Sequence, residues 1–331
     1  MQSLLNYNTF GIDHSCKKIY EPRTVAELQE MLPMLRKEPL LIVGGGSNLL
    51  LTRDFEGNVL HPMIKGIERD SQGDGGCTLR IGAGEVWDDV VQCTVEENLS
   101  GMENLSLIPG DVGASAVQNI GAYGVEAKDL ICLIEAVEIA TGEIVKISPS
   151  ECNYGYRYSR FKDEWKGKYV ITHVIYKLSE TFEPRLDYGN LRSVLQERGI
   201  NNPSLHDVRD VIIEIRNAKL PDPKVEGNAG SFFMNPIVSK EKAGNLIKEY
   251  PNMPHYNISE TEEKIPAGWL IEQSGWKGKT LGKAGVHDKQ ALVLVNKGGA
   301  TGKEILALSD AVCKTVREKF GIELKPEVNI I

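Results

Sequence analysis

The sequence predicts a mixed α+β protein built from two or three folding units. Its 331 residues exceed the roughly 100–200 residues of one ordinary domain. Segments with strand-like alternation and segments with helix-like spacing follow one another along the chain. Pro221 and Pro223 end a helical pattern, and we place the preferred domain boundary at this proline pair. Hydrophobic residues make up 41% of the chain and charged residues 25%, which is the composition of a folded globular protein.

The first half of the chain contains most of the predicted strands. Residues before Arg23 are polar and resemble a loop. Helical spacing predicts helices at 23–34 and 86–97. Apolar runs and alternation predict strands at 40–43, 59–64, 78–83, 131–139, 144–147 and 169–178. The charged, glycine-containing segment 67–77 predicts a surface hairpin.

The second half is richer in predicted helix. Helical spacing predicts helices at 208–218, 240–249 and 303–320. A small-residue loop follows the proline pair, and a second glycine-rich stretch spans 275–285. A strand at 291–295 and an extended tail at 322–331 complete the unit. The chain shows no internal repeat and no low-complexity segment.

Charge and cysteine content exclude several classes of function. The net charge is −8, which disfavours nucleic acid or an anionic membrane as the main partner. No run approaches the roughly 18 apolar residues of a membrane span, and residues 1–10 lack the apolar core of a signal peptide. The six cysteines form no CxxC pair and the six histidines no HxxxH pair. We therefore expect a cytoplasmic chain with reduced thiols and no metal site.

Two glycine-rich segments are candidate ligand loops. The sequence Gly44-Gly45-Gly46-Ser47-Asn48 follows a predicted strand, and exposed backbone N–H groups in such turns approach phosphate oxygens closely. It lacks the dinucleotide fingerprint, because the third glycine of that motif would fall on Leu49. The alternative is a tight turn with Asn48 in a left-handed conformation.

The segment 109–124 is the second candidate loop. It contains too many small residues for a packed helix and is too long for an ordinary connection, which favours a functional loop. Its glycines would let the backbone lie flat against a large, phosphate-bearing cofactor, and its polar side chains offer neutral hydrogen bonds. A loop packed on itself is an equal alternative. The candidate cofactor contacts are Pro109, Gly110, Gly113, Ala114, Ser115, Gln118, Asn119, Gly121 and Gly124.

Two other motifs are incomplete. Gly278-Lys279-Thr280 ends like a phosphate-binding P-loop, but Gln273 stands where that motif needs glycine. Gly230-Ser231 resembles half of a nucleophile elbow, but Ala229 stands where GxSxG needs glycine. The sequence therefore disfavours an ATPase and a serine hydrolase.

Three further residues carry groups suited to chemistry. Ser231 lies between a glycine and two phenylalanines, where a hydroxyl could give a proton to a substrate, or could serve as a helix cap or turn hydroxyl. Arg157 lies among aromatic residues, where a guanidinium can hold a carboxylate. Glu327 lies in an apolar tail and is either a paired carboxylate or a catalytic group.

The motifs together resemble one family. GGGSN (44–48), SLIPGxVGASxxQNIGAYG (106–124), YGYRxSxF (154–161), LPDPKxxGNAGSFFxNP (220–236) and PEV (326–328) occur in order over almost the whole chain. This set resembles the UDP-N-acetylenolpyruvoylglucosamine reductase (MurB) family. The segment LDYGN at 186–190 resembles the tyrosine loop of its type I subgroup.

The resemblance implies a fold and a cofactor. The implied fold is α+β, with an FAD-binding portion of the vanillyl-alcohol-oxidase (PCMH) type in two subdomains and an α+β substrate-binding domain. The subdomains would span 1–66, completed by 320–331, and 67–205; the substrate-binding domain would span 206–319. The two glycine-rich segments would hold non-covalent FAD, with NADPH as co-substrate.

The resemblance also assigns residues. Arg157, Ser231 and Glu327 match the family's catalytic positions: NADPH reduces FAD, hydride passes to the enolpyruvyl methylene, and Ser231 protonates the adjacent carbon. Arg157 and Glu327 would stabilise the intermediate. Residues similar to the family's substrate-contacting positions are Tyr123, Tyr188, Lys219, Asn235, Tyr256 and Lys264. Many members carry arginine where Asn329 stands and a basic residue where Met234 stands.

The expected product is UDP-N-acetylmuramate, made from UDP-N-acetylglucosamine enolpyruvate in peptidoglycan precursor synthesis by a monomer. Two alternatives stay open. Another non-covalent FAD oxidoreductase of the same superfamily would keep the glycine loops, which contain no His or Cys for covalent attachment. A non-catalytic nucleotide-binding protein would also keep those loops, but it would not need Arg157, Ser231 and Glu327 together.

Overall fold

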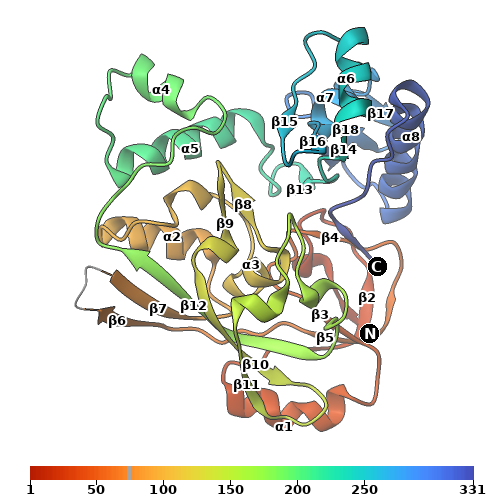
Figure 1. Ribbon diagram of the computed structural model, residues 1–331. Helices are drawn as coiled ribbons and strands as arrows, with labels where there is room; N and C mark the ends of the chain where they lie inside the picture. The colour runs from red at the N-terminus through yellow and green to blue at the C-terminus, as the bar shows by residue number, and fades with distance from the viewer. Residues whose placement is uncertain (73–75) are drawn as a thin grey trace. The chain divides into compact units, whose positions relative to one another are not determined.

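The computed structural model describes residues 1–72 and 76–331. The chain forms two compact units (Figure 1). Unit 1 comprises Met1–Gln2, Cys16–Gly45 and Phe55–Ala218. Unit 2 comprises Ser3–Ser15, Gly46–Asp54 and Lys219–Ile331. No helix among the described residues is both long enough and apolar enough to cross a membrane.

Runs of strands and runs of helices follow one another in both units, which confirms the predicted α+β class. The helices are α1 (Val25–Leu35), α2 (Trp87–Glu96), α3 (Val112–Gln118), α4 (Leu191–Glu197), α5 (Leu205–Lys219), α6 (Lys240–Glu249), α7 (Ala267–Gln273) and α8 (Gly302–Phe320). The strands up to residue 126 are β1 (Gln2–Ser3), β2 (Ser15–Tyr20), β3 (Leu40–Ile42), β4 (Leu49–Leu50), β5 (Phe55–Leu60), β6 (Ile67–Gln72), β7 (Gly76–Gly82), β8 (Gly121–Ala122) and β9 (Val125–Glu126). The later strands are β10 (Ile131–Glu138), β11 (Ile144–Ile147), β12 (Tyr169–Ser179), β13 (Gly227–Ser231), β14 (Ile237–Ser239), β15 (Tyr256–Asn257), β16 (Glu262–Lys264), β17 (Thr280–Leu281), β18 (Ala284–Val286), β19 (Val293–Asn296) and β20 (Asn329–Ile330).

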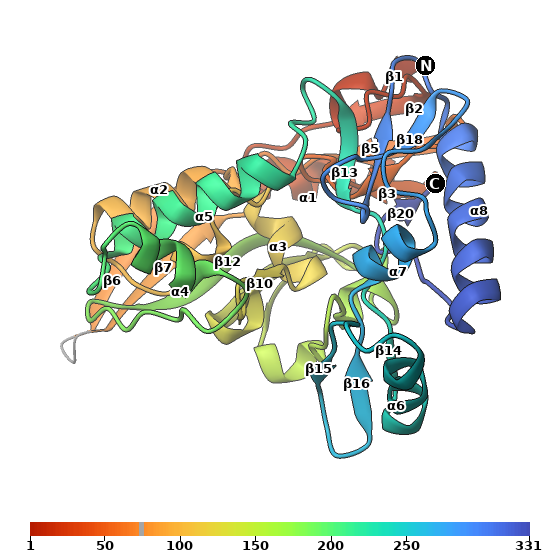
Figure 2. The same ribbon diagram turned by 90° about the horizontal axis from the view of Figure 1, so that it is seen from above.

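Unit 1 contains an antiparallel sheet of order β11-β10-β12-β7-β6. Helices α2 and α3 cover one of its faces (Figures 1 and 2). Trp87 of α2, Ala116 of α3 and Tyr176 of β12 are buried in the same hydrophobic core. The predicted hairpin is confirmed, because β6 and β7 pair from Ile67↔Ile81 to Gln72↔Gly76; residues 73–75 of that prediction lie outside the described part of the chain.

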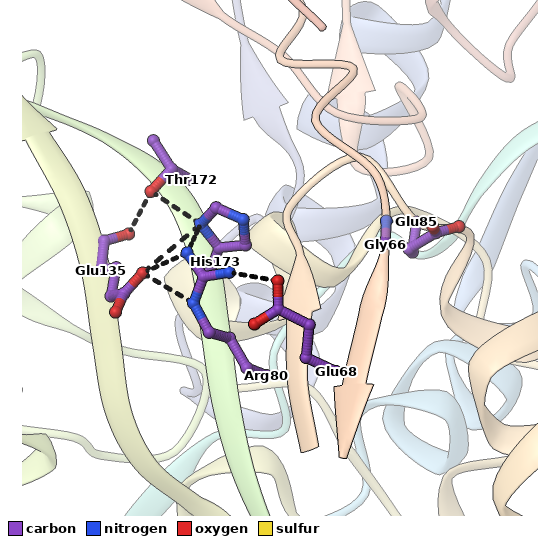
Figure 3. Close-up of polar contacts among 7 residues, drawn as sticks. All are labelled: Gly66, Glu68, Arg80, Glu85, Glu135, Thr172 and His173. Atoms are coloured by element: carbon purple, nitrogen blue, oxygen red, sulfur yellow. Dashed lines mark hydrogen bonds and ion pairs between the residues drawn. The ribbon is translucent and has the colours of Figure 1, made fainter. Parts of the chain in front are cut away.

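The opposite face of this sheet carries a charged network (Figure 3). Arg80 donates hydrogen bonds to Glu135 Oε2 at 2.7 and 3.0 Å and to Glu68 Oε1 at 3.1 Å. It also donates to His173 Nδ1 at 3.0 Å, and Thr172 Oγ1 donates to the Glu135 carbonyl at 3.1 Å. The network thus joins strands β6, β7, β12 and β10.

Two predictions about unit 1 are wrong. The N-terminal segment is not a loop: β2 pairs in parallel with β5, and its adjacent Lys17 and Lys18 obscure the alternation that a strand would show. The segment 109–124 is not structureless, because it contains α3. A Cβ on Gly113 would lie 2.9 Å from the Cβ of Ala83, so the small residues let this helix pack closely on the sheet instead of preventing it.

Unit 2 is built around α7, α8 and the sheet β13-β19-β18-β17. Phe232 and Phe233 of the predicted catalytic segment are fully buried in its core. Three residues from the start of the chain, Phe10, Ile12 and Leu50, belong to the same core. A smaller sheet of order β14-β16-β15 and the parallel pair β20-β4 complete the unit.

Candidate functional site

Arg157 lies in a tight turn of unit 1. Gly155 and Tyr158 exchange backbone hydrogen bonds of 3.0 and 3.1 Å across this turn. Arg157 itself has a φ of +55°, a left-handed conformation that non-glycine residues adopt rarely and at a cost of about 1–2 kcal/mol. Such strained residues persist only where their surroundings hold them. The turn therefore fixes the backbone of Arg157 in one unusual conformation.

The guanidinium of Arg157 is held by the segment that follows α3. Nη2 donates to the Gly121 carbonyl at 2.5 Å, and Nη1 donates to the Asn119 carbonyl at 3.3 Å. A Cβ on Gly121 would lie 2.9 Å from both the Val125 carbonyl oxygen and Arg157 Nη1, and the backbone contact with Val125 favours glycine here. The guanidinium also lies over the Tyr156 ring, 5.3 Å from its centroid.

Two predicted cofactor contacts use their side chains within the fold. Ser115 is 1% exposed, and its hydroxyl contacts the Val112 carbonyl and the Tyr176 hydroxyl at 2.7 and 2.6 Å. Asn119 is fully buried, and its amide donates to Glu126 and to the Gly155 carbonyl. The structure therefore leaves these two residues with only their backbones to contribute to a ligand.

The loop after β3 begins in unit 1, beside the segment that opens α3. A Cβ on Gly44 would lie 3.2 Å from Asp111 Oδ2, and a Cβ on Gly45 would lie 3.2 Å from the Cα of Gly110. Among the described residues, none accepts a hydrogen bond from the N–H groups of Gly44 and Gly45. Asp111 is itself paired with His61 Nε2 at 3.0 Å. The loop thus combines close backbone packing with two donors available to a ligand.

The same loop ends in unit 2, where Gly46 rather than Asn48 is left-handed, with a φ of +66°. The alternative that placed Asn48 in a left-handed conformation is wrong in that detail. A Cβ on Gly46 would lie 2.1 Å from the Tyr7 carbonyl oxygen, which restricts this position to glycine. The Asn48 amide donates to the Glu327 carbonyl at 3.3 Å, and its own carbonyl accepts the N–H and side-chain amide of Asn329.

Ser231 and Glu327 lie on adjoining segments of unit 2. Ser231 is the last residue of β13 and is exposed, so it does not cap a helix. The next residue, Phe232, accepts the backbone N–H of Glu327 at 2.8 Å, and Phe233 pairs with Pro326. The buried phenylalanines anchor one segment, and this pairing aligns the other with it.

Three predicted substrate residues gather on a neighbouring part of unit 2. Asn235 Oδ1 accepts the backbone N–H of Ala267 at 2.9 Å, which fixes the start of α7. Tyr256 pairs with Lys264 between β15 and β16, and the Lys264 ammonium lies 5.9 Å from the centroid of the Tyr256 ring. An amide, an ammonium and an aromatic ring therefore lie within one small sheet and its connection.

Two predicted substrate tyrosines lie together in unit 1. A Cβ on Gly124 would lie 3.5 Å from the Cβ of Tyr188, and Gly124 directly follows Tyr123. Tyr123 has a φ of +48° and packs against the cluster formed by α4 and α5. Burial raises the pKa of its phenol, so its hydroxyl stays neutral and can donate a hydrogen bond. Lys219, the remaining predicted contact, is the last residue of α5.

The structure reveals residues that the sequence analysis missed. Lys162 donates to the Gln118 side chain at 2.7 Å and to the Arg157 carbonyl at 3.0 Å. Arg216 of α5 donates to the Leu107 carbonyl at 3.2 Å, while its buried Nε has no acceptor among the described residues. Burial lowers the pKa of this guanidinium. The sequence around Lys162 and Arg216 does not indicate these contacts. Lys162 only follows Arg157 by five residues, and Arg216 is one of several charged residues on an amphipathic helix.

The structure brings the predicted residues together in two groups. Those placed in unit 1 are Gly44, Gly45, the 109–124 residues, Tyr123, Arg157 and Tyr188. Those placed in unit 2 are Gly46, Ser47, Asn48, Lys219, Ser231, Asn235, Tyr256, Lys264 and Glu327. No group of three or more His, Cys, Asp and Glu side chains is arranged for a metal ion in residues 1–72 and 76–331.

The chain is similar to known proteins over almost all of its length. Residues 222–331 match the family model of the UDP-N-acetylenolpyruvoylglucosamine reductase C-terminal domain, and residues 17–148 match that of an FAD-binding domain. UDP-N-acetylenolpyruvoylglucosamine reductases from Bacteroides fragilis and Flavobacterium johnsoniae are 54% and 49% identical to it, over 99% of this chain and 98% of each relative. The crystal structure of the Thermus caldophilus reductase has a TM-score of 0.67 and 22% identity, covering 100% of this chain and 99% of that one.

Proposed function

The chain belongs to the UDP-N-acetylenolpyruvoylglucosamine reductase family, and we propose on this premise how its residues reduce UDP-N-acetylglucosamine enolpyruvate to UDP-N-acetylmuramate. It is a flavin-dependent oxidoreductase of peptidoglycan precursor synthesis that uses FAD, with NADPH as the reductant. The high identity over 99% of the chain supports this reaction over another flavin oxidoreductase or a non-catalytic nucleotide binder.

The residues present fit FAD. The N–H groups of Gly44 and Gly45 have no acceptor among the described residues, and backbone N–H groups in a glycine turn suit diphosphate oxygens. Asp111 beside them is paired with His61, whose imidazolium would offset its charge. Although burial alone lowers the pKa of His61, the hydrogen bonds and charges of Asp111 and Glu21 raise it overall. When it is bound there and reduced by NADPH, FAD would supply the hydride that reduces the enolpyruvyl group.

Three residues of the chain are assigned to the chemistry that follows. Arg157 binds the substrate carboxylate and stabilises the negative charge that develops beside it, because its guanidinium is planar and permanently charged. Glu327 polarises the same part of the substrate, the reacting centre beside its carboxylate. Ser231 donates a proton to the carbon next to the carboxylate, which completes the reduction.

The observation that carries this assignment is the alignment of Ser231 with Glu327. The hydrogen bond from the Glu327 N–H to the Phe232 carbonyl, 2.8 Å long, holds a hydroxyl and a carboxylate on adjoining segments. The buried Phe232 and Phe233 anchor the Ser231 segment, and the Glu327 segment pairs with it. Catalytic groups on such rigid supports keep the geometry that proton transfer requires.

Substrate recognition is assigned to the remaining residues. Lys219 and Lys264 suit the diphosphate, because ammonium groups bind phosphate as point charges. Asn235 and the rings of Tyr123, Tyr188 and Tyr256 suit the uracil and the sugar. The proposal keeps the three-part division into 1–66 with 320–331, 67–205 and 206–319, and a monomer acting in the cytoplasm.

Substitution of Ser231 by alanine tests the proton donor. Flavin reduction by NADPH needs no proton at a substrate carbon, so we expect that half-reaction to keep the parent rate. Reoxidation of the reduced flavin by the enolpyruvyl substrate should slow by about 10²–10⁴-fold, the contribution of a positioned general acid. Stopped-flow absorbance measures both half-reactions.

Ser231→Cys is the conservative comparison, since a thiol is a stronger acid than a hydroxyl. We expect it to recover part of the lost rate. If the alanine variant reoxidises at the parent rate, the proton comes from another group. If the parent enzyme itself fails to reoxidise with this substrate, the proposed reaction is wrong.

A further inference from the structure

Lys162 lies at the end of a short segment that is fixed to α3. The preceding Ser159 is fully buried, and its hydroxyl donates to the Val117 carbonyl at 2.6 Å. Phe161 is buried in the core of unit 1 and packs edge-to-face against Trp165. A lysine held between such anchors has little freedom, so its ammonium can act as a fixed donor.

The Lys162 ammonium bridges two parts of the predicted site. It donates to Gln118 Oε1, on the last residue of α3, at 2.7 Å. It also donates to the backbone carbonyl of Arg157 at 3.0 Å. The lysine therefore ties the turn that carries Arg157 to the helix that precedes the glycine-rich segment.

Arg157 needs such a support because its backbone is left-handed, with a φ of +55°. Gly155 and Tyr158 hold the turn only at its two ends. Rotation of the Arg157 peptide toward an ordinary conformation would carry its carbonyl away from Lys162 and swing the guanidinium away from Asn119 and Gly121. The ammonium thus opposes the relaxation that the strain favours.

We propose that Lys162 is a positioning residue that holds Arg157 in its strained conformation, so that the guanidinium is presented to the substrate carboxylate. The inference rests on the proposed function for the role of Arg157. Lys162 itself acts through the Arg157 carbonyl and through Gln118, and it needs no contact with substrate.

Lys162→Met tests the proposal, because methionine keeps an unbranched side chain and removes the ammonium. Flavin content and flavin reduction by NADPH should match the parent. Reoxidation by the enolpyruvyl substrate should slow by about 10²-fold, the effect of misplacing a reacting group by 1 Å. Lys162→Arg, which can also reach two acceptors, should restore part of the rate. Lys166→Met, at an exposed lysine four residues later, is the matched control and should behave like the parent.

A double-mutant cycle shows whether the lysine acts through the arginine. In an Arg157→Ala background, Lys162→Met should not slow reoxidation any further, because the arginine that Lys162 positions is absent. Additive losses would overturn the proposal, and so would a Lys162→Met variant that reoxidises at the parent rate. Equal losses in both half-reactions would assign Lys162 to the flavin site and overturn the proposal too.

A crystal structure of the Lys162→Met variant gives a result that does not depend on the reaction. We expect Arg157 to leave its positive φ, or its guanidinium to leave the Gly121 carbonyl. An unchanged Arg157 would overturn the proposal even if reoxidation by the enolpyruvyl substrate were slowed. If the parent failed to turn over the enolpyruvyl substrate, the proposed function would fall, and this structure would still decide whether Lys162 positions Arg157.

Discussion

His173 is held neutral by its neighbours on the sheet of unit 1. It is 8% exposed, and its Nδ1 accepts a hydrogen bond from Arg80 at 3.0 Å (Figure 3). A nitrogen that accepts this bond carries no proton. Burial lowers the pKa of His173, and the positive charge of Arg80 lowers it further, although Glu135 and Glu68 oppose the shift.

This lowered pKa predicts a loss of stability on acidification. The unfolded chain has a histidine pKa of about 6.5, so below that pH the unfolded state binds more protons than the folded state. The free energy of unfolding should therefore fall as the pH drops below about 6.5 toward the lower pKa of folded His173. His173→Gln, which keeps an acceptor for Arg80, should flatten this part of the profile. Urea unfolding at a series of pH values measures it.

The pKa of His61 is shifted in the opposite direction to that of His173. Its pKa is raised overall in the folded protein, so its contribution is complete below a pH of about 6.5 and is lost as the pH rises through the folded value. His61→Gln should therefore remove a loss of stability at higher pH.

For His173, the outcome that would contradict the prediction is also clear. If the stability of His173→Gln changed with pH in the same way as that of the parent below a pH of about 6.5, His173 would not be the group that causes the loss on acidification.

At the scale of elements, α2 and α5 are joined by a nearly buried ion pair. Arg209 of α5 donates to both oxygens of Asp88 at 2.8 and 3.1 Å, and its side chain is 9% exposed. Asp88 Oδ1 also accepts the N–H of Leu107 at 2.5 Å, and Arg216 of α5 binds the Leu107 carbonyl. Side chains of the two helices thus bind both the N–H and the carbonyl of Leu107, just before the 109–124 segment.

Asp88→Ala should therefore destabilise the protein strongly. It leaves a buried guanidinium and the Leu107 N–H without their acceptor. We expect the free energy of unfolding to fall by about 3 kcal/mol, the lower end of the range for a broken buried pair, because the Asp88 side chain keeps 25% exposure. Asp89→Ala, at an exposed aspartate of the same helical turn, is the matched control.

Urea unfolding of the two alanine variants decides the matter. Equal and small losses would mean that Asp88 and Arg209 contribute no more than a surface pair, about 0–1 kcal/mol. The double variant Asp88→Leu with Arg209→Leu should lose less than Asp88→Ala alone, since no buried charge is left behind.

At the scale of the whole molecule, FAD should be bound without a covalent bond. Segments 44–48 and 109–124 contain no histidine and no cysteine, so they offer backbone donors but no covalent anchor. We expect the purified protein to be yellow and to release intact FAD on acid or heat denaturation. Flavin that remained with the precipitated protein would contradict this, and so would a colourless protein that FAD cannot reconstitute. Added FAD should also raise the melting temperature, because a ligand of the folded state stabilises it.

The sequence determined the α+β class, most of the elements and the two glycine-rich segments. These features depend mainly on neighbouring residues. A run rich in β-branched and aromatic residues gives a strand such as β12, and 3.6-residue spacing gives a helix such as α8. The ordered motifs also identified the family, and the relatives confirm it.

The tertiary structure alone decided which polar groups face inward and which distant segments meet. Ser115 and Asn119 resemble ligand donors in the sequence, yet both are buried and hydrogen-bonded within unit 1. Phe10 and Leu50 join the core of unit 2 although most of that unit follows residue 218. The ammonium of Lys162 meets Gln118 across 44 residues. Burial and long-range hydrogen bonds depend on how the whole chain packs, and a local pattern of residue types contains no information about that packing.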